Sequence, residues 1–232
     1  MKVCLITGAS RGIGRAAALA LSEAGWRLSL AGRTKEPLVE LVKNGVSCED
    51  LATLCDVTRE EDVVQLVQAT VAEFGRLDAV VCTAGVGSFG ATTDVTLESW
   101  EAQIATNLTG TFLVCREALK IMLPQKSGHI VNVLSVGSKI VFPGAAAYCA
   151  SKWGAYGLTK ALAEEVRREG IRVTALIPGA TDTPFWDANP GGPDKSLMLK
   201  PESVGQAIRY ALEAPEDASI DEIMLLPRNG VI

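Results

Sequence analysis

The chain has 232 residues, of which 48% are hydrophobic and 21% charged, so it can bury a full core and is not a disordered polypeptide. A net charge of −5, with no stripe of Lys and Arg along any helix, argues against nucleic acid as a partner. No apolar run reaches the length of a membrane span, and the N-terminus turns glycine-rich too early for a signal peptide. We therefore expect a cytoplasmic protein without a membrane partner.

Apolar runs alternate with helical patterns along the whole chain. The predicted strands are 2–6, 27–31, one ending near 54–57, 77–82, 129–134, 171–177 and 220–226. The predicted helices are 15–24, 34–43, 58–74 (with Thr58 as its cap), 96–122, 147–169 and 201–214. This alternation predicts an α/β fold of the Rossmann type, a doubly wound parallel sheet of about seven strands with helices on both faces. No linker or repeat divides the chain, so we expect a single domain over residues 1–232.

A glycine-rich turn joins the first strand to the first helix. It has the spacing Gly-x-x-x-Gly-x-Gly, formed by Gly8, Gly12 and Gly14. Glycine permits positive φ and close approach of a ligand to the backbone, and the helix N-terminus offers free N–H groups. This setting is typical of phosphate binding, although glycine turns also serve as plain tight connections.

The end of the second strand carries an arginine where many dinucleotide-binding folds carry an acid. It reads Ala-Gly-Arg-Thr, ending in Arg33 and Thr34. An acidic residue here binds the adenosine ribose, whereas an arginine accommodates a 2′-phosphate. Arg11, in the glycine turn, can approach the same phosphate. Two cations and no carboxylate favour NADP over NAD, against the alternative that both arginines are ordinary solvated side chains.

Three polar side chains converge near the fifth strand and the helix that follows it. Ser135 follows the strand, and Tyr148 and Lys152 are four residues apart, so they share one face of the helix. Tyrosine is a poor base, with a reference pKa of about 10, but a cation within about 4–6 Å lowers that pKa. Lys152 is placed to be this cation, and Ser135 can hold a substrate oxygen. The spacing Tyr-x-x-x-Lys is common by chance. The interpretation as a proton-transfer site therefore depends largely on the glycine turn elsewhere in the chain.

Cysteine and histidine usage predicts no metal site. The six cysteines show no Cys-x-x-Cys spacing and most lie in apolar runs, so buried thiols are expected. His129 is the only histidine, which excludes a histidine-based triad and favours a structural role. The stretch 184–200, rich in Pro and Gly, is expected to be irregular and to form a substrate loop.

Together these motifs resemble the classical short-chain dehydrogenase/reductase (SDR) family over essentially the whole chain. The order and spacing of Asn107, Ser135, Tyr148 and Lys152 match the family's catalytic tetrad. Further matches are the glycine turn, Asp56-Val57, Thr83-Ala84-Gly85, Pro178-Gly179 and Thr183. There is a general similarity to 3-oxoacyl-acyl-carrier-protein reductases. Cys82 and Thr83 replace two asparagines usual in the family, which implies altered packing near the adenosine.

The resemblance implies an NADP(H)-dependent oxidoreductase that transfers hydride between nicotinamide and a carbonyl or secondary alcohol. Tyr148 would donate or take the substrate proton, and Lys152 would lower the pKa of Tyr148 and hold the nicotinamide ribose. Ser135 would orient the substrate, and Asn107 would support a water leading to Lys152. The implied cofactor-binding residues are Gly8, Ser10, Arg11, Gly12, Ile13, Gly14, Arg33, Thr34, Asp56, Val57, Ala84, Gly85, Tyr148, Lys152, Pro178, Gly179, Thr181 and Thr183.

The expected substrate is a small molecule with an apolar or aromatic carbonyl. The residues expected to line its pocket are Val86, Phe89, Val136, Phe142, Phe185 and Trp186. Phe185 and Trp186 could equally pack a lid. Against an acyl-carrier substrate, the predicted mouth has no basic cluster beyond Lys139 and Lys195.

The sequence also bears on two alternative functions and on the oligomeric state. A catalytically silent NADP-binding sensor would be expected to lack Tyr148 or Lys152, and both are present. An epimerase or dehydratase usually needs a larger substrate domain than the residues after Thr183 provide. The long helices expected at 96–122 and 147–169 form four-helix interfaces in the family, which implies a homodimer or homotetramer.

Overall fold

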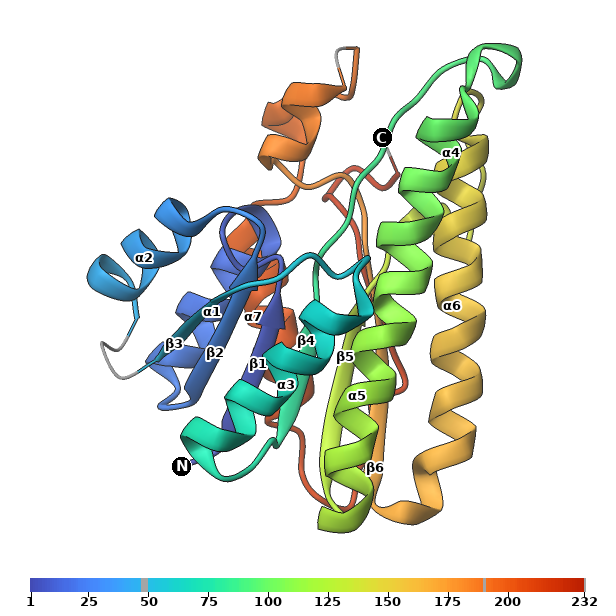
Figure 1. The fold of residues 1–232 in the computed structure, drawn as a ribbon. Helices are drawn as coiled ribbons and strands as arrows, with labels where there is room; N and C mark the ends of the chain where they lie inside the picture. The colour runs from blue at the N-terminus through green and yellow to red at the C-terminus, as the bar shows by residue number, and fades with distance from the viewer. Residues whose placement is uncertain (47–49, 190, 232) are drawn as a thin grey trace.

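The computed structural model describes residues 1–46, 50–189 and 191–231. The described residues form a parallel seven-stranded sheet of order β3-β2-β1-β4-β5-β6-β7 with helices on both faces (Figure 1). The strands are β1 (Val3–Thr7), β2 (Arg27–Gly32), β3 (Leu51–Leu54), β4 (Ala79–Cys82), β5 (Gly128–Val133), β6 (Ile171–Pro178) and β7 (Glu222–Leu225). The predicted doubly wound fold is confirmed.

Helices cover both faces of the sheet, and the central strands β1, β4, β5 and β6 are buried on both sides. The helices are α1 (Gly12–Glu23), α2 (Lys35–Asn44), α3 (Glu60–Phe74), α4 (Leu97–Ile104), α5 (Gly110–Gln125), α6 (Ala146–Val166) and α7 (Pro201–Leu212). Successive strand side chains point to opposite faces. Leu5 of β1 accordingly packs with Leu66 of α3, whereas Ile6 packs with Leu21 of α1 and Ile208 of α7.

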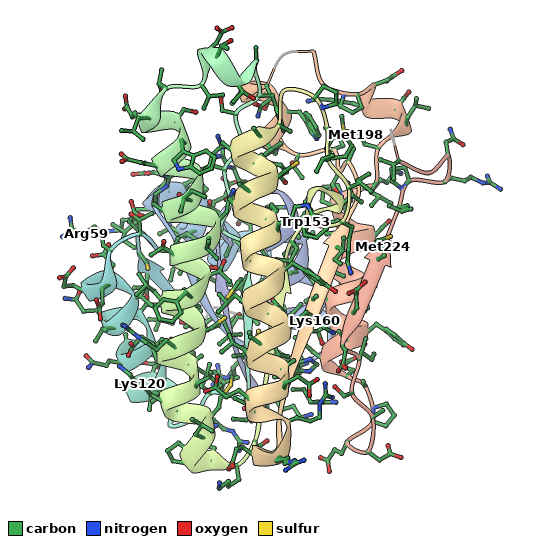
Figure 2. All side chains as sticks on the ribbon, turned by 90° about the vertical axis from the view of Figure 1, so that its right-hand side faces the viewer. Arg59, Lys120, Trp153, Lys160, Met198 and Met224 are labelled. Atoms are coloured by element: carbon green, nitrogen blue, oxygen red, sulfur yellow. The ribbon has the colours of Figure 1, made fainter. Side chains whose placement is uncertain are left out.

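The long helix predicted over 96–122 is interrupted. After α4 the chain makes a π-helical turn, Ala105–Thr109, and continues as α5. The polar residues Asn107 and Thr109 lie in this turn, and the hydroxyl of Thr111, at the start of α5, donates to the carbonyl of Asn107 at 2.9 Å. Single π-helical turns occur frequently at functional sites. Figure 2 shows α5 and α6 side by side on one side of the molecule.

The cap predicted for α3 is wrong. The helix begins at Glu60, and both the N–H and the hydroxyl of Thr58 instead donate to Oδ1 of Asp56, at 3.0 and 2.8 Å. Asp side chains commonly accept such bonds from the residue two positions on, which turns the chain before a helix can start. The other end is as expected, because Gly75 stops the helix in the left-handed conformation, with φ +74°.

The stretch 184–200 contains two short 3₁₀ turns, Pro184–Ala188 and Lys195–Leu197, and returns to the body of the fold through a bridge between Thr181 and Leu199. Pro190, within this stretch, and Cys48 lie outside the described residues. The five described cysteines, Cys4, Cys55, Cys82, Cys115 and Cys149, are all buried, as predicted. In the described ranges no helix is both long and apolar enough to cross a lipid bilayer.

His129, near the start of β5, is buried in a defined tautomer. Its Nε2 lies 2.8 Å from the hydroxyl oxygen of Thr174, and that hydroxyl donates to the carbonyl of Ile220. Nε2 must therefore carry the proton, and Nδ1 has no hydrogen-bond partner among the residues that the structure describes. The geometry agrees with the structural role predicted for this residue.

We expect the chain to lose stability as the pH falls below about 6.5. Burial, assisted by the charges of Arg172 and Lys2, lowers the pKa of His129 from 6.5 to about 3. Between these values the unfolded chain takes up a proton and the folded chain does not. The free energy of unfolding should fall by about 2 kcal/mol between about pH 7.5 and about pH 5, as measured by urea unfolding.

The variant His129→Gln is the control for this pH dependence. It should show little slope in that range, because carboxyl groups titrate mostly at lower pH. Equal wild-type stability at the two pH values would contradict the assignment.

Candidate functional site

A cavity of about 1070 Å³ lies at the carboxyl ends of the central strands. The strand order reverses its direction between β1 and β4, and ligands of doubly wound sheets bind outside the carboxyl ends of the strands at such a point. The cavity is lined by every residue predicted to bind cofactor or to line the substrate pocket, and by Ser135. Asn107 does not line it.

The glycine turn forms one wall of the cavity and requires its glycines. Gly8 and Gly12 have φ of +66° and +53°, in the left-handed region that disfavours other residues. A Cβ on Gly8 would lie 2.8 Å from the backbone nitrogen of Ala84, and one on Gly14 would overlap the carbonyl oxygen of Gly8. Arg11 precedes α1 without a side-chain cap, so the turn and the first N–H groups of the helix can accept an anion.

Two arginines stand at the same end of the cavity as Asp56. Arg11 and Arg33 both line it and are exposed, and their guanidinium groups make no hydrogen bond or ion pair with another described residue. Burial alone would raise the pKa of the Asp56 carboxyl, but hydrogen bonds from Thr58 and the charges of Arg33 and Arg59 lower it. This end of the cavity therefore offers guanidinium groups for a phosphate and one ionised carboxylate.

Ser135, Tyr148 and Lys152 meet in the middle of the cavity. Ser135 begins the turn after β5, and its hydroxyl oxygen accepts from the N–H of Gly137 at 3.0 Å. Tyr148 and Lys152 lie one turn apart on α6, with Nζ of Lys152 at 5.9 Å from the centre of the Tyr148 ring. Lys152 is buried and donates to the carbonyl of Val133 at 3.2 Å.

The lowering of the Tyr148 pKa expected from Lys152 is not found. Burial raises the pKa of Tyr148 to about 12, although the hydrogen bond with Ser135 acts against this rise. Burial also lowers the pKa of Lys152 to about 8. Desolvation of the phenol is the largest cause of this rise, and Nζ of Lys152 is directed to the carbonyl of Val133. Tyr148 is thus a neutral phenol near neutral pH, which suits a proton donor.

Asn107 acts on the site through its neighbours. Its side chain accepts from the N–H of Val86 at 2.9 Å and donates to the carbonyl of Val86 at 2.8 Å and to the hydroxyl of Ser151 at 2.9 Å. Ser151 in turn donates to the carbonyl of Tyr148 at 2.8 Å. Asn107 therefore joins the segment after β4 to α6. Sequence reasoning missed Ser151, for which the only signal is its place between Tyr148 and Lys152.

Aromatic rings close the far end of the cavity. The centre of the Phe89 ring lies 5.5 Å from that of Tyr148 and 6.1 Å from that of Trp186, on which it stacks at 12°. Phe185 lies 5.9 Å from Tyr148 and 5.2 Å from Trp186. These rings come from three segments far apart in sequence, and together they form an apolar surface beside the phenol of Tyr148.

The two residues that depart from the family's usual asparagines are accommodated in different ways. The hydroxyl of Thr83 donates to the carbonyl of Thr7 at 2.5 Å, which joins the ends of β4 and β1. Cys82 is buried in contact with Cys115, and this contact and burial raise its pKa far above the usual value. Thr83 therefore keeps the carboxyl ends of β1 and β4 joined by a hydrogen bond.

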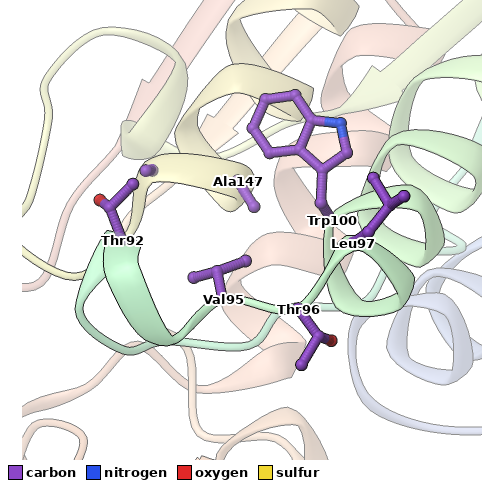
Figure 3. A pocket seen from close by; sticks show the side chains of 7 residues that line it. Thr92, Val95, Thr96, Leu97, Trp100 and Ala147 are labelled. Carbon is purple, nitrogen blue, oxygen red and sulfur yellow. The ribbon is translucent and has the colours of Figure 1, made fainter.

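A second hollow of about 330 Å³ lies between the start of α4 and the start of α6 (Figure 3). Its lining carries no ionisable side chain, so it offers no means of proton transfer. The lining residues are Thr92, Val95, Thr96, Leu97, Trp100, Ala146 and Ala147.

The fold and the main cavity define a dinucleotide-binding α/β protein with Ser, Tyr and Lys side chains at the carboxyl ends of its strands. The family model described as short chain dehydrogenase matches residues 2–191, so the chain belongs to this family of oxidoreductases. An uncharacterized oxidoreductase of Staphylococcus saprophyticus is 35% identical over 229 residues, and one of Staphylococcus aureus is 36% identical over 227. Each comparison covers 97% of both proteins.

Solved structures agree with this family. An alcohol dehydrogenase from the archaeon Thermococcus sibiricus, complexed with 5-hydroxy-NADP, is 33% identical with a TM-score of 0.87. A variant of actinorhodin polyketide ketoreductase with NADPH is 32% identical with a TM-score of 0.88. Both comparisons cover 97% of this chain and 96% of the other. Levodione reductase is 31% identical with a TM-score of 0.89, covering 97% and 95%.

Proposed function

We propose that this protein is an NADP(H)-dependent reductase of ketones or aldehydes, with Tyr148 as the proton donor. The observation that carries the proposal is the meeting of Ser135, Tyr148 and Lys152 in one cavity with the glycine turn. A proton donor and a cofactor cradle in one cavity can act on the same substrate. Structures similar to this chain contain NADP or NADPH, which supports the choice of cofactor.

The residues present fit a dinucleotide with a 2′-phosphate. The turn leaves no room for a side chain on Gly8 or Gly14, so its backbone stays open to the cavity, and Arg11 and Arg33 supply cations there. We assign the adenine end to Asp56 and Val57, and the nicotinamide end to Lys152 and the residues that follow β6, namely Pro178, Gly179, Thr181 and Thr183. The bound cofactor supplies the hydride.

The side chains of this chain manage the proton. Tyr148, neutral near pH 7, donates its phenolic proton to the substrate oxygen as that oxygen gains charge. Ser135, hydrogen-bonded to Tyr148, holds the same oxygen. Lys152, one helical turn from Tyr148 and lining the same cavity, would hold the nicotinamide ribose. Asn107 fixes the position of Tyr148 relative to the segment after β4, because it binds Val86 directly and Tyr148 through Ser151.

The substrate side favours an apolar or aromatic carbonyl over an acyl-carrier protein, with 184–200 as the substrate loop. Lys139 is bound to Glu222 at 2.9 Å and to the hydroxyl of Tyr156 at 2.7 Å. Lys195 is bound to Asp187 at 3.1 Å. Neither lysine is left to attract an acidic carrier, and the rings of Phe89, Phe185 and Trp186 suit a flat apolar group.

The proposal is tested by measuring initial rates of NADPH and NADH consumption with a panel of ketones, aldehydes, diketones and acyl thioesters as substrates. We expect turnover with NADPH on ketones or aldehydes that carry an apolar or aromatic group. Tight NADPH binding without turnover on any member would overturn the reductase and favour the silent sensor.

We also propose that α5 and α6 form the contact between two copies of the chain. Phe112 on α5 and Trp153 on α6 are 42% and 45% exposed, so these two neighbouring helices both present a large apolar group to the surface. Figure 2 shows Trp153 on α6. We expect light scattering to show a dimer or tetramer for the wild type, and Trp153→Lys to increase the monomer fraction. A monomeric wild type would contradict the proposed contact.

A further inference from the structure

Gln103, on α4, is a buried polar residue that sequence reasoning did not single out. Its side chain is 2% exposed. Its Oε1 accepts from the N–H of Ser88 at 3.2 Å, and its Nε2 donates to the carbonyl of Ser99 at 3.2 Å. A buried amide is costly when its polar atoms lack partners, so Gln103 holds Ser88 in place as well as satisfying itself.

The segment around Ser88 is also held on both sides. Asn107, one helical turn after Gln103, holds Val86 through two hydrogen bonds. The N–H of Gly90 donates to the carbonyl of Gly144, in the loop before α6, at 2.8 Å. The backbone of the segment is therefore hydrogen-bonded at every second residue. Val86 and Ser88 bind the side chains of Asn107 and Gln103, and Gly90 binds the loop before α6.

Phe89 lies between two of these attachments, and its ring faces the reaction site. It is 5.5 Å from the ring of Tyr148 and stacks on Trp186. Its partners Phe185 and Trp186 belong to the short 3₁₀ turn of the substrate loop. Phe89 thus forms the side of the substrate pocket that is hydrogen-bonded, through its backbone neighbours, to the rest of the fold. A flat substituent on the carbonyl carbon of a substrate would lie against its ring.

We propose that Gln103 is a positioning residue that holds Phe89 beside Tyr148, and that Phe89 thereby selects carbonyl substrates bearing an aromatic group. The selectivity part rests on the reductase function proposed above. Gln103 touches neither the cavity nor the reacting atoms, so its effect passes through Ser88 and Phe89. Contacts between aromatic rings are worth a few-fold to about tenfold in binding, which sets the size of the expected effect.

The test compares Gln103→Met with a matched control, Gln125→Met. Gln125 also binds a backbone through its amide, accepting from the N–H of Leu77 at 3.2 Å and donating to its carbonyl at 2.8 Å. Leu77 precedes β4, at the opposite end of that strand from the cavity. Both substitutions remove an amide of the same size that binds a backbone segment. Gln125 is exposed whereas Gln103 is buried, so urea unfolding of both variants separates a general loss of stability from a local effect.

Two readouts separate the parts of the proposal. Hydrogen exchange followed by mass spectrometry on peptides covering 84–91 reports the attachment of Ser88 without any need for catalysis. The ratio of kcat/KM for phenyl methyl ketone to kcat/KM for a small dialkyl ketone reports selectivity. Phe89→Leu removes the ring directly and should lower this ratio to about the same extent.

We expect Gln103→Met to speed exchange in this segment about fivefold, as expected for the loss of one hydrogen bond. It should lower the selectivity ratio about fivefold, with NADPH affinity unchanged within about twofold. Adding it to Phe89→Leu should lower the ratio no further. Unchanged exchange, or a ratio equal to that of Gln125→Met, would overturn the proposal. A wild type that reduces neither ketones nor aldehydes would overturn the reductase function, and the exchange result would still decide the positioning role.

Discussion

Replacing Tyr148 with Phe is expected to lower the rate of carbonyl reduction about 10³-fold, the size of effect typical for loss of a positioned proton donor. The substitution removes one hydroxyl and keeps the ring, so its contacts with Phe89 and Phe185 remain. Affinity for NADPH should change by no more than about twofold, because one neutral hydroxyl contributes little to binding a multiply charged ligand. Steady-state rates and fluorescence titration with NADPH measure the two quantities.

The matched control is Tyr156→Phe. Tyr156 lies two turns further along α6, and its hydroxyl interacts with Lys139 and Glu222 rather than with the cavity. It should keep most of the wild-type rate. If Tyr148→Phe retained substantial activity while Tyr156→Phe behaved as expected, Tyr148 would not be the proton donor, and Ser135 would be the next group to test.

Replacing Arg33 with Asp is expected to weaken NADPH binding about 100-fold and to leave NADH nearly unaffected. The loss corresponds to one charge-assisted hydrogen bond to a 2′-phosphate together with new repulsion from the carboxylate. Asp56 lies close enough for the charge of Arg33 to lower its pKa, so the new carboxylate would add to an existing negative charge. Titration of each variant with both cofactors gives the ratio of dissociation constants.

Arg59→Asp serves as the control for net charge. Arg59 also lowers the pKa of Asp56, but it stands before α3 at the edge of the molecule (Figure 2) and pairs with Asp62 at 3.4 Å. It does not line the cavity. It should leave the preference between NADPH and NADH unchanged. If Arg33→Asp also left that preference unchanged, the end of β2 would not bind the 2′-phosphate.

Features that depend on neighbours in sequence could be predicted from the residues alone. The alternation of apolar and amphipathic stretches determines a parallel sheet covered on both faces. The spacing of Gly8, Gly12 and Gly14 determines an open turn at the start of α1. The four-residue separation of Tyr148 and Lys152 places them on one face of a helix, because helical periodicity is a local property.

Features that depend on distant neighbours were decided by the tertiary structure. The pKa of Tyr148 rises because the folded chain buries the phenol, and no local pattern reports how much water is removed. Lys139 is one of only two cations at the predicted mouth, and the structure shows that it pairs with Glu222, 83 positions away. Asn107 matched a catalytic position, but only the π-helical turn and the approach of α6 show that it binds Val86 and Ser151. Each of these outcomes follows from long-range contacts and desolvation, which arise only when the sheet and helices have packed.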